Sequence, residues 1–316
     1  MDDHPETVAV WLTNRQVACW HFTEQNAALL RRELPAAQVV VCADEAQFLA
    51  VLPEASAALV WRFDPAWLER APRLRRLATP AAGHDWLRVP PRPGLQITYG
   101  AFHGEIIAET VLGLMLGACR GLLHAQRLQD AGAVWPRNEL APGMRPLRGS
   151  HAVILGFGAI GQWIARLAKP FGVRITGVRR RSGMPRPEYF DAADRLVAPD
   201  KLDALLPAAD HLILALPGDT GTDCILDARR LALLPPGACL YNVGRGNAVD
   251  ETALAAALRE NRLAFAGLDV FQQEPLPADS PLRLCPNALL LPHASAIAPN
   301  YLDLFVREFA ASFLNG

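Results

Sequence analysis

Three ionisable side chains stand just after predicted strands, where they could act on one ligand. Arg245 follows an apolar segment ending in Tyr241–Val243 and lies between two glycines, so a turning backbone presents its planar guanidinium. Such a fork can hold a carboxylate through two charge-assisted hydrogen bonds. His293 directly follows Leu289–Pro292, and histidine can exchange a proton near neutral pH. Glu274 lies in the loop after another predicted strand, and a carboxylate that reaches His293 would orient its ring and raise its pKa.

Each of these side chains also has an ordinary structural interpretation. Arg245 could contact a phosphate or the solvent, Glu274 could be a solvated loop charge, and His293 could cap a helix or sit satisfied in the core. The chemical interpretation is favoured by their shared position, because ligands of open parallel sheets bind beyond the carboxyl ends of the strands.

A glycine-rich segment, Gly156–Gly161, predicts a dinucleotide site at the same sheet edge. It reads Gly156, Phe157, Gly158, Ala159, Ile160 and Gly161, and it connects the apolar run Ala152–Leu155 to a helical pattern over 159–171. The three glycines would allow a tight turn, close approach of a pyrophosphate and close packing of helix on strand. The helix N-terminus would offer free N–H groups to the phosphates. The motif alone also fits any tight strand-to-helix turn.

Short apolar runs alternate with helical patterns along most of the chain, which predicts an α/β protein with parallel sheets. One long helix with a broad apolar face is predicted over 105–129, and an amphipathic helix over 299–314 should pack back onto the first domain. The irregular segment 132–149 either wraps onto a partner subunit or is a surface excursion. The predicted strands are 8–12, 39–42, 57–61, 74–78, 95–99, 152–155, 173–178, 211–216, 239–243, 263–269 and 288–291.

Composition excludes several classes of function. The 316 residues are 51% hydrophobic and carry a net charge of −1, so we expect no nucleic-acid or acidic membrane partner. The six cysteines are scattered without zinc-type spacing, which predicts no metal site and mostly buried thiols in a reducing compartment. Neither a signal peptide nor an 18-residue apolar run is found, so a cytoplasmic location is predicted.

The sequence resembles the D-isomer-specific 2-hydroxyacid dehydrogenases, a family that includes glyoxylate/hydroxypyruvate reductases, D-lactate dehydrogenases and phosphoglycerate dehydrogenases. The matching segments occur in the family's order and at its usual separations, and they cover essentially the whole chain. They are His103–Val111, Gly156–Gly161, Asn242–Gly246, Gly267–Phe271 with Glu274–Pro277, and Pro292–Ser295.

The resemblance implies two doubly wound parallel-sheet domains with a cleft between them. Residues 1–101 plus 294–316 would form a flavodoxin-like substrate-binding domain, and residues 102–293 a Rossmann dinucleotide-binding domain. A homodimer is also implied. Phe102 and His103, near the boundary, would pack at the hinge or contact the substrate.

The resemblance also assigns roles to residues. Arg245 would bind the substrate carboxylate, His293 would be the general acid/base and Glu274 its partner. In the reductive direction a dihydronicotinamide would give hydride to the keto carbon while His293 gives a proton to the oxygen. The backbone of Ala82 and Gly83 would help hold the carboxylate, and the nicotinamide would be lined by Leu216, Pro217, Val243 and Asp269.

One departure from the family pattern predicts the choice of cofactor. NAD-dependent members carry an acidic residue after the second strand of the nucleotide domain, whereas this chain has Arg179, Arg180, Arg181 and Ser182 there. Cations and a hydroxyl suit a 2′-phosphate, so NADP(H) is predicted to be preferred, with NAD possible. A solvated basic loop with weak discrimination is the alternative.

These features together predict an oxidoreductase that reduces a glyoxylate- or hydroxypyruvate-like 2-keto acid to the D-2-hydroxy acid with NADPH. Two alternatives remain from the sequence: an NAD-dependent dehydrogenase of another D-2-hydroxy acid, and a dinucleotide-sensing binding protein like the family's corepressor relatives.

Overall fold

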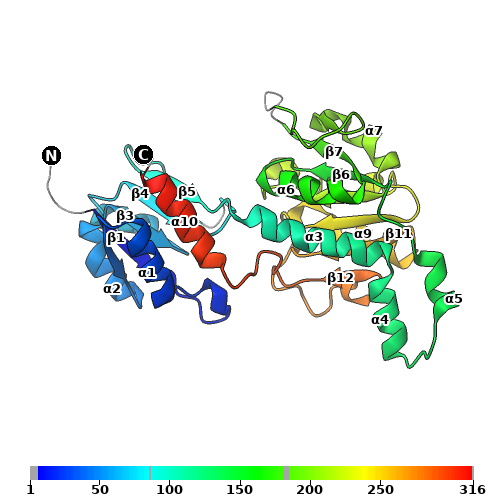
Figure 1. Ribbon diagram of the computed structural model, residues 1–316, viewed down its shortest axis with the longest axis horizontal. Coiled ribbons are helices and arrows are strands. Elements are labelled where there is room, and N and C mark those ends of the chain that lie inside the picture. The colour runs from blue at the N-terminus through cyan, green and yellow to red at the C-terminus, as the bar shows by residue number, and fades with distance from the viewer. Residues whose placement is uncertain (1–5, 85–86, 181–184, 315–316) are drawn as a thin grey trace. The chain divides into compact units, whose positions relative to one another are not determined.

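The chain forms two compact units in the computed structural model, which describes residues 6–84, 87–180 and 185–314 (Figure 1). Unit 1 is Met1–His103 together with Ile297–Gly316, and unit 2 is Gly104–Ala296. The boundaries predicted from the sequence, 101/102 and 293/294, lie close to these junctions.

Unit 1 is built on a five-stranded parallel sheet of order β2-β1-β3-β4-β5. This is the flavodoxin-like strand order, as predicted. Buried aromatic and aliphatic side chains such as Trp11, Phe48 and Leu77 fill one face of the sheet. The strands are β1 (Thr7–Trp11), β2 (Gln38–Val41), β3 (Ala57–Val60), β4 (Arg76–Thr79) and β5 (Gln96–Tyr99), and the helices between them are α1 (Glu24–Glu33) and α2 (Glu45–Val51).

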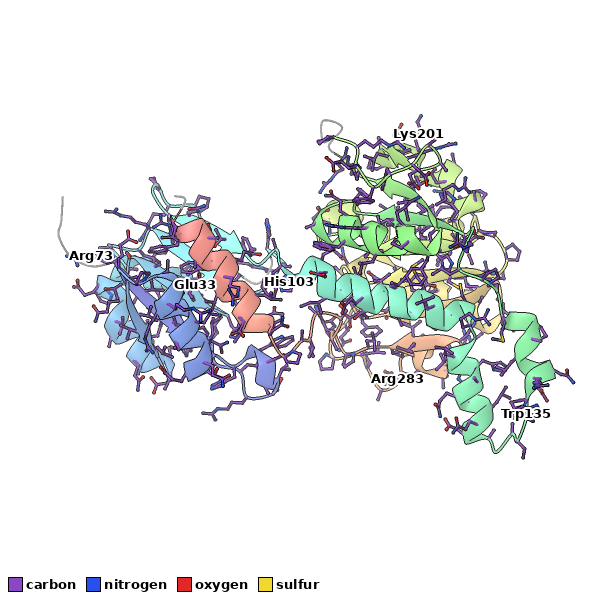
Figure 2. All side chains as sticks on the ribbon, in the orientation of Figure 1. Glu33, Arg73, His103, Trp135, Lys201 and Arg283 are labelled. Atoms are coloured by element: carbon purple, nitrogen blue, oxygen red, sulfur yellow. The ribbon has the colours of Figure 1, made fainter. Side chains whose placement is uncertain are left out.

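The helix α10 (Tyr301–Leu314) completes unit 1, as the sequence predicted, although it is far from the rest of the unit in the chain. It packs beside α1, where Asn26 Nδ2 donates to Asp303 Oδ1 at 2.7 Å. Arg307 lies 3.5 Å from Glu33, which Figure 2 labels. The apolar side of α10, including Tyr301, is buried.

Unit 2 contains a seven-stranded parallel sheet of order β12-β11-β10-β9-β6-β7-β8. The chain starts at β6, extends to one side through β7 and β8, and then crosses to β9, so the order reverses between β6 and β9 as in a Rossmann fold. The strands are β6 (His151–Leu155), β7 (Arg174–Val178), β8 (Arg195–Val197), β9 (His211–Leu214), β10 (Ala238–Asn242), β11 (Leu263–Leu268) and β12 (Ala288–Leu290).

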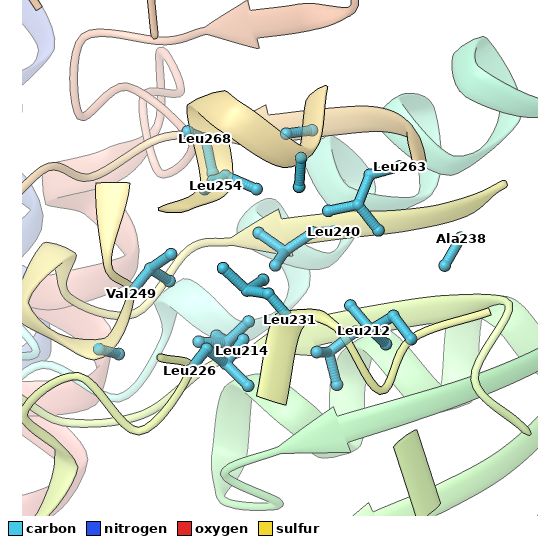
Figure 3. Packing of buried hydrophobic residues seen from close by; sticks show 14 of the residues in the cluster. Leu212, Leu214, Leu226, Leu231, Ala238, Leu240, Val249, Leu254, Leu263 and Leu268 are labelled. Carbon is cyan, nitrogen blue, oxygen red and sulfur yellow. The ribbon is translucent and has the colours of Figure 1, made fainter. Parts of the chain in front are cut away.

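Both faces of this sheet are buried, which is why its strands read as nearly continuous apolar runs. Leu212 and Leu214 of β9 join one core with Leu240 and Leu254 (Figure 3). Ile213, between them in the chain, points to the second core on the opposite face. The helices of unit 2 are α3 (His103–Cys119, beginning at the unit boundary), α4 (Leu122–Asp130), α5 (Arg137–Leu140), α6 (Ala159–Ala168), α7 (Leu202–Leu205), α8 (Ala228–Leu231) and α9 (Glu251–Arg259).

The single helix predicted over 105–129 is wrong, because the chain breaks into α3 and α4. Gly121 adopts a left-handed conformation with φ of 61°, which ends α3 and starts a new helix at 64° to it. Among the described residues no single helix is long and apolar enough to cross a membrane, and only this bent pair reaches the required length and composition. α3 is largely buried along its length, whereas α4 has no buried residue.

Candidate functional site

The structure brings Glu274 and His293 into direct contact. Glu274 lies in the loop after β11, and His293 follows the adjacent strand β12, so neighbouring parallel strands deliver both to one sheet edge. The Nδ1 atom of His293 lies 2.8 Å from Oε2 of Glu274. The other carboxylate oxygen accepts a hydrogen bond from the Phe271 N–H at 3.0 Å, which fixes the carboxylate.

The electrostatics of this pair favour a charged imidazolium beside a carboxylate. The hydrogen bond to Glu274 raises the pKa of His293, although burial and the nearby Arg245 charge oppose the rise. Burial alone would raise the pKa of Glu274, but the hydrogen bonds from His293 and Phe271, with the charges of His293 and Arg245, lower it overall. Because Arg245 acts on both groups, the three side chains belong to one electrostatic site.

A buried carboxylate holds the backbone that carries His293. Asp269, at the end of β11, is 1% exposed and accepts from the N–H groups of Ala294 at 2.6 Å and Ser295 at 3.1 Å. The Ser295 hydroxyl also donates to it, and the His293 N–H donates to the Asp269 carbonyl at 2.9 Å. His293 itself has a φ of 53°, which is costly for a residue with a side chain. These bonds therefore hold the imidazole in a strained, defined position.

Arg245 is set by the turn after β10. It is half-buried, and its Nη1 donates to the Gly244 carbonyl at 2.9 Å. The buried Asn242 amide closes the turn, because Nδ2 donates to the Arg245 carbonyl at 3.0 Å and Oδ1 accepts from the Gly244 N–H at 3.1 Å. A Cβ at Gly246 would lie 1.8 Å from the Phe271 carbonyl carbon, so only glycine fits there. Asn242 is a positioning residue that the sequence pattern alone did not single out.

A cavity of about 380 Å³ lies at the carboxyl edge of β6, β7 and β9. The glycine turn supplies Gly156, Phe157 and Gly158, the end of β7 supplies Arg179 and Arg180, and the loop after β9 supplies Leu216, Pro217, Gly221 and Thr222. The predicted glycine turn, Arg179 and Arg180 of the basic segment, and Leu216–Pro217 thus meet around one space.

The glycine turn has the geometry that a pyrophosphate needs. Gly156 has a φ of 89°, and a Cβ there would lie 2.3 Å from the Ala215 carbonyl oxygen. Gly158 faces open space and precedes α6 without a side-chain cap, so the N–H groups at the start of α6, over Ala159, Ile160 and Gly161, are available to an anion. The residues present therefore fit a dinucleotide phosphate.

The other predicted site residues have different surroundings. Arg181 and Ser182 lie outside the described residues. Val243 is 5% exposed and packs in the second core, so it does not line the cavity. Ala82, which is exposed, and Gly83 follow β4 in unit 1.

His103 has the contacts of a packing residue. It is 4% exposed, its Nε2 lies 2.8 Å from the Tyr301 hydroxyl, and its ring stacks on Phe102. Burial lowers the pKa of His103 to about 4, so the ring is neutral at physiological pH. These contacts lie within unit 1, and the hinge and substrate roles of Phe102 and His103 stay predictions.

Comparison with known proteins agrees with this arrangement. The sequence profile described as "D-isomer specific 2-hydroxyacid dehydrogenase, NAD binding domain" matches residues 112–295. The chain is 35% identical over 237 residues to glyoxylate/hydroxypyruvate reductase B of Pectobacterium carotovorum, covering 73% of this chain and 72% of that one. It is 36% identical over 245 residues to glyoxylate reductase of Aeropyrum pernix, covering 74% and 71%.

The chain belongs to the D-isomer specific 2-hydroxyacid dehydrogenase family. A solved family structure from Aeromonas salmonicida matches with a TM-score of 0.75 and 32% identity, over 99% of this chain and 97% of that one. A second, from Xanthobacter autotrophicus in complex with NADPH and MES, matches with a TM-score of 0.73 and 25% identity, over 98% and 96%. This dehydrogenase is thus an NAD(P)-dependent oxidoreductase of small 2-hydroxy or 2-keto acids.

Proposed function

We propose that this dehydrogenase reduces glyoxylate- or hydroxypyruvate-like 2-keto acids to D-2-hydroxy acids with NADPH, and that His293 donates the proton. The observation that carries the proposal is the 2.8 Å contact between His293 and Glu274 beside the Arg245 charge. Reduction of a 2-keto acid requires two protein groups, a proton donor and a cation that binds the carboxylate.

The side chains divide the chemistry between them. With Nδ1 turned to Glu274, the Nε2 atom of protonated His293 gives its proton to the substrate oxygen, and the Glu274 carboxylate stabilises the imidazolium before transfer. The guanidinium of Arg245 binds the substrate carboxylate and orients the keto group. Backbone N–H groups of Ala82 and Gly83 are a second contact for that carboxylate. When bound, the reduced nicotinamide supplies the hydride.

Preference for NADPH is supported by the charges beside the cofactor cavity. Arg179 and Arg180 line it, and β7 is followed by cations where an acidic residue would bind an unphosphorylated ribose. The relative from Xanthobacter autotrophicus was crystallised with NADPH. The small substrate is supported by the names of the bacterial and archaeal relatives, which are glyoxylate or glyoxylate/hydroxypyruvate reductases.

A homodimer is supported by an apolar arm on unit 2, the segment 122–144 that contains α4 and α5. Neither helix has a buried residue, and Val134 and Trp135 are 92% and 73% exposed. Figure 2 labels Trp135 on this arm. Exposed large apolar side chains gathered on one segment are typical of a protein interface.

Turnover of a panel of 2-keto acids tests the function. We expect the wild type to reduce glyoxylate or hydroxypyruvate with a higher kcat/KM for NADPH than for NADH, and His293→Ala to lower kcat about 10²- to 10⁴-fold. Equal rates in both proteins would refute the role of His293. Preference for NADH with another keto acid would support the alternative, an NAD-dependent dehydrogenase of a different D-2-hydroxy acid.

A further inference from the structure

An ion pair lies beside the cofactor cavity and includes one of its lining cations. The Nη2 atom of Arg180 lies 3.1 Å from Oδ2 of Asp219. Arg180 follows β7, and Asp219 lies in the loop after β9, so the pair joins two loops at the same sheet edge. Arg180 lines the cavity, as do Gly221 and Thr222 just after Asp219.

The position of the Asp219 carboxylate is set by the loop that follows β9. One oxygen accepts from Arg180, and the side chain also caps the 3-10 turn that follows it. Its backbone begins the short 3-10 turn Thr220–Thr222, and its N–H donates to the Thr222 hydroxyl at 3.3 Å. The local fold thus fixes the carboxylate beside Arg180.

We propose that Asp219 is a specificity-determining residue that competes with the 2′-phosphate of NADP for Arg180. This inference rests on the proposed preference for NADPH, which Asp219 would limit. A 2′-phosphate that binds Arg180 must either displace the Asp219 carboxylate or bind the same guanidinium beside it. In the second case the two anions repel each other. Asp219 therefore lowers the preference for NADPH over NADH below the value that the cations after β7 would give without it.

The size of the effect follows from the exposure of the pair. The side chains of Arg180 and Asp219 are 72% and 40% exposed, so the bridge itself is weak and yields readily to a doubly charged phosphate. Repulsion between that phosphate and a carboxylate roughly 6 Å away in screened water changes affinity by about threefold. Loss of the bridge adds a factor of similar size, so removal of the carboxylate should tighten NADPH binding about three- to tenfold.

Dissociation constants of the full chain for NADPH and NADH, measured by calorimetry, test the proposal. Asp219→Asn keeps the shape and removes the charge, and we expect it to raise the ratio Kd(NADH)/Kd(NADPH) about three- to tenfold while Kd for NADH stays unchanged. In an Arg180→Met background the same change should raise the ratio less, and 1 M salt should shrink the effect. Asp223→Asn is the matched control, because this exposed carboxylate of the same loop pairs with Asn247 Nδ2 at 2.5 Å.

The outcomes separate this inference from the proposed function. An unchanged or lower ratio in Asp219→Asn, an equal change for both nucleotides, or an equal rise in Asp223→Asn would overturn the competition. So would a rise of the same size in the Arg180→Met background. The preference for NADPH is judged from the wild-type ratio, and the role of Asp219 is judged from the change in that ratio, so either can fail without the other. Melting curves of each variant confirm that the compared proteins are folded.

Discussion

His293 depends on two carboxylates that act on different parts of the residue. Glu274 contacts the ring and raises its pKa, whereas Asp269 accepts from the backbone on either side of Ala294 and holds the loop. Glu274 thus affects the pKa of the imidazole, and Asp269 affects the position of the ring. A change at either carboxylate should therefore impair the same step for different reasons.

The raised pKa of His293 predicts a pH dependence with a definite sign. If His293 donates the proton as proposed, reduction needs the protonated ring. The value of kcat/KM should then be high at low pH and fall as pH rises through the folded-state pKa, which lies above the usual 6.5. The stabilisation of the fold by this pair follows the same direction for His293, being present below the unfolded pKa and lost above the folded one. Oxidation of the 2-hydroxy acid needs the neutral ring and should show the opposite slope.

Glu274→Gln tests this assignment through a pH–rate profile. The neutral amide no longer favours the imidazolium, so the fall in reductive kcat/KM should move to lower pH, and the rate near pH 8 should drop about 10- to 100-fold. Asp279→Asn removes a charge from the same loop at an exposed position and serves as the control. An unshifted profile in Glu274→Gln would mean that another group controls the proton.

Residue types could be predicted from the sequence better than residue contacts. Arg245, Glu274 and His293 could be singled out as candidates because each follows a predicted strand and stands in a family motif. The pairing of Arg180 with Asp219 could not be found in this way, because it joins loops after two strands whose separation depends on the whole sheet. The sequence pattern predicted that Arg180 binds the 2′-phosphate, but it did not predict the ion pair with Asp219.

At the scale of elements, the strand order explains why distant segments meet at one edge. All neighbouring strands of unit 2 run parallel, so every loop that follows a strand emerges on the same side. The period of apolar residues was enough to predict the main strands, but not β8, because its sequence has one arginine and only two apolar residues and so gives no periodic pattern. The break between α3 and α4 was also missed, because a glycine inside a helical pattern does not reveal its φ.

The glycine turn between β6 and α6 should not tolerate a side chain. Gly156→Ala places a Cβ 2.3 Å from the Ala215 carbonyl oxygen at a φ of 89°, so we expect a loss of about 3 kcal/mol in the free energy of unfolding. Calorimetry should show a fall of roughly 5 to 10 °C in Tm together with weakened binding of NADPH. Gly113→Ala, in α3 with nothing near its Cβ, is the control and should not lower Tm. An unchanged Tm in Gly156→Ala would contradict the described turn.

For the whole molecule, the sequence indicated two domains because β–α alternation occurs twice with a long helix between. The strand orders of the two sheets do not follow from that alternation alone, because different doubly wound orders share it. Assembly is harder to read from a sequence, since an apolar residue in an irregular segment looks the same whether it is buried or exposed. Trp135 is recognised as a surface residue only from its 73% exposure.

If the arm 122–144 forms the dimer interface, Trp135→Ser should weaken the dimer at least about tenfold without unfolding the protein. A residue this exposed in the isolated chain contributes little to its own fold. Light scattering during size-exclusion chromatography gives the mass of each variant over a dilution series. Leu284→Ser removes an equally exposed apolar side chain elsewhere on unit 2 (72% exposed) and should leave the mass unchanged. A monomeric wild type would refute the dimer.

The position of α10 in unit 1 has a consequence for how the protein is made. The first unit is completed by residues from Ile297 onward, so the chain made up to His103 lacks the helix that packs beside α1. During translation the ribosome must first synthesise all of Gly104–Ala296, and this middle unit can fold while the earlier one waits with an apolar surface uncovered. We therefore expect chaperones to bind newly made chains mainly at the N-terminal unit.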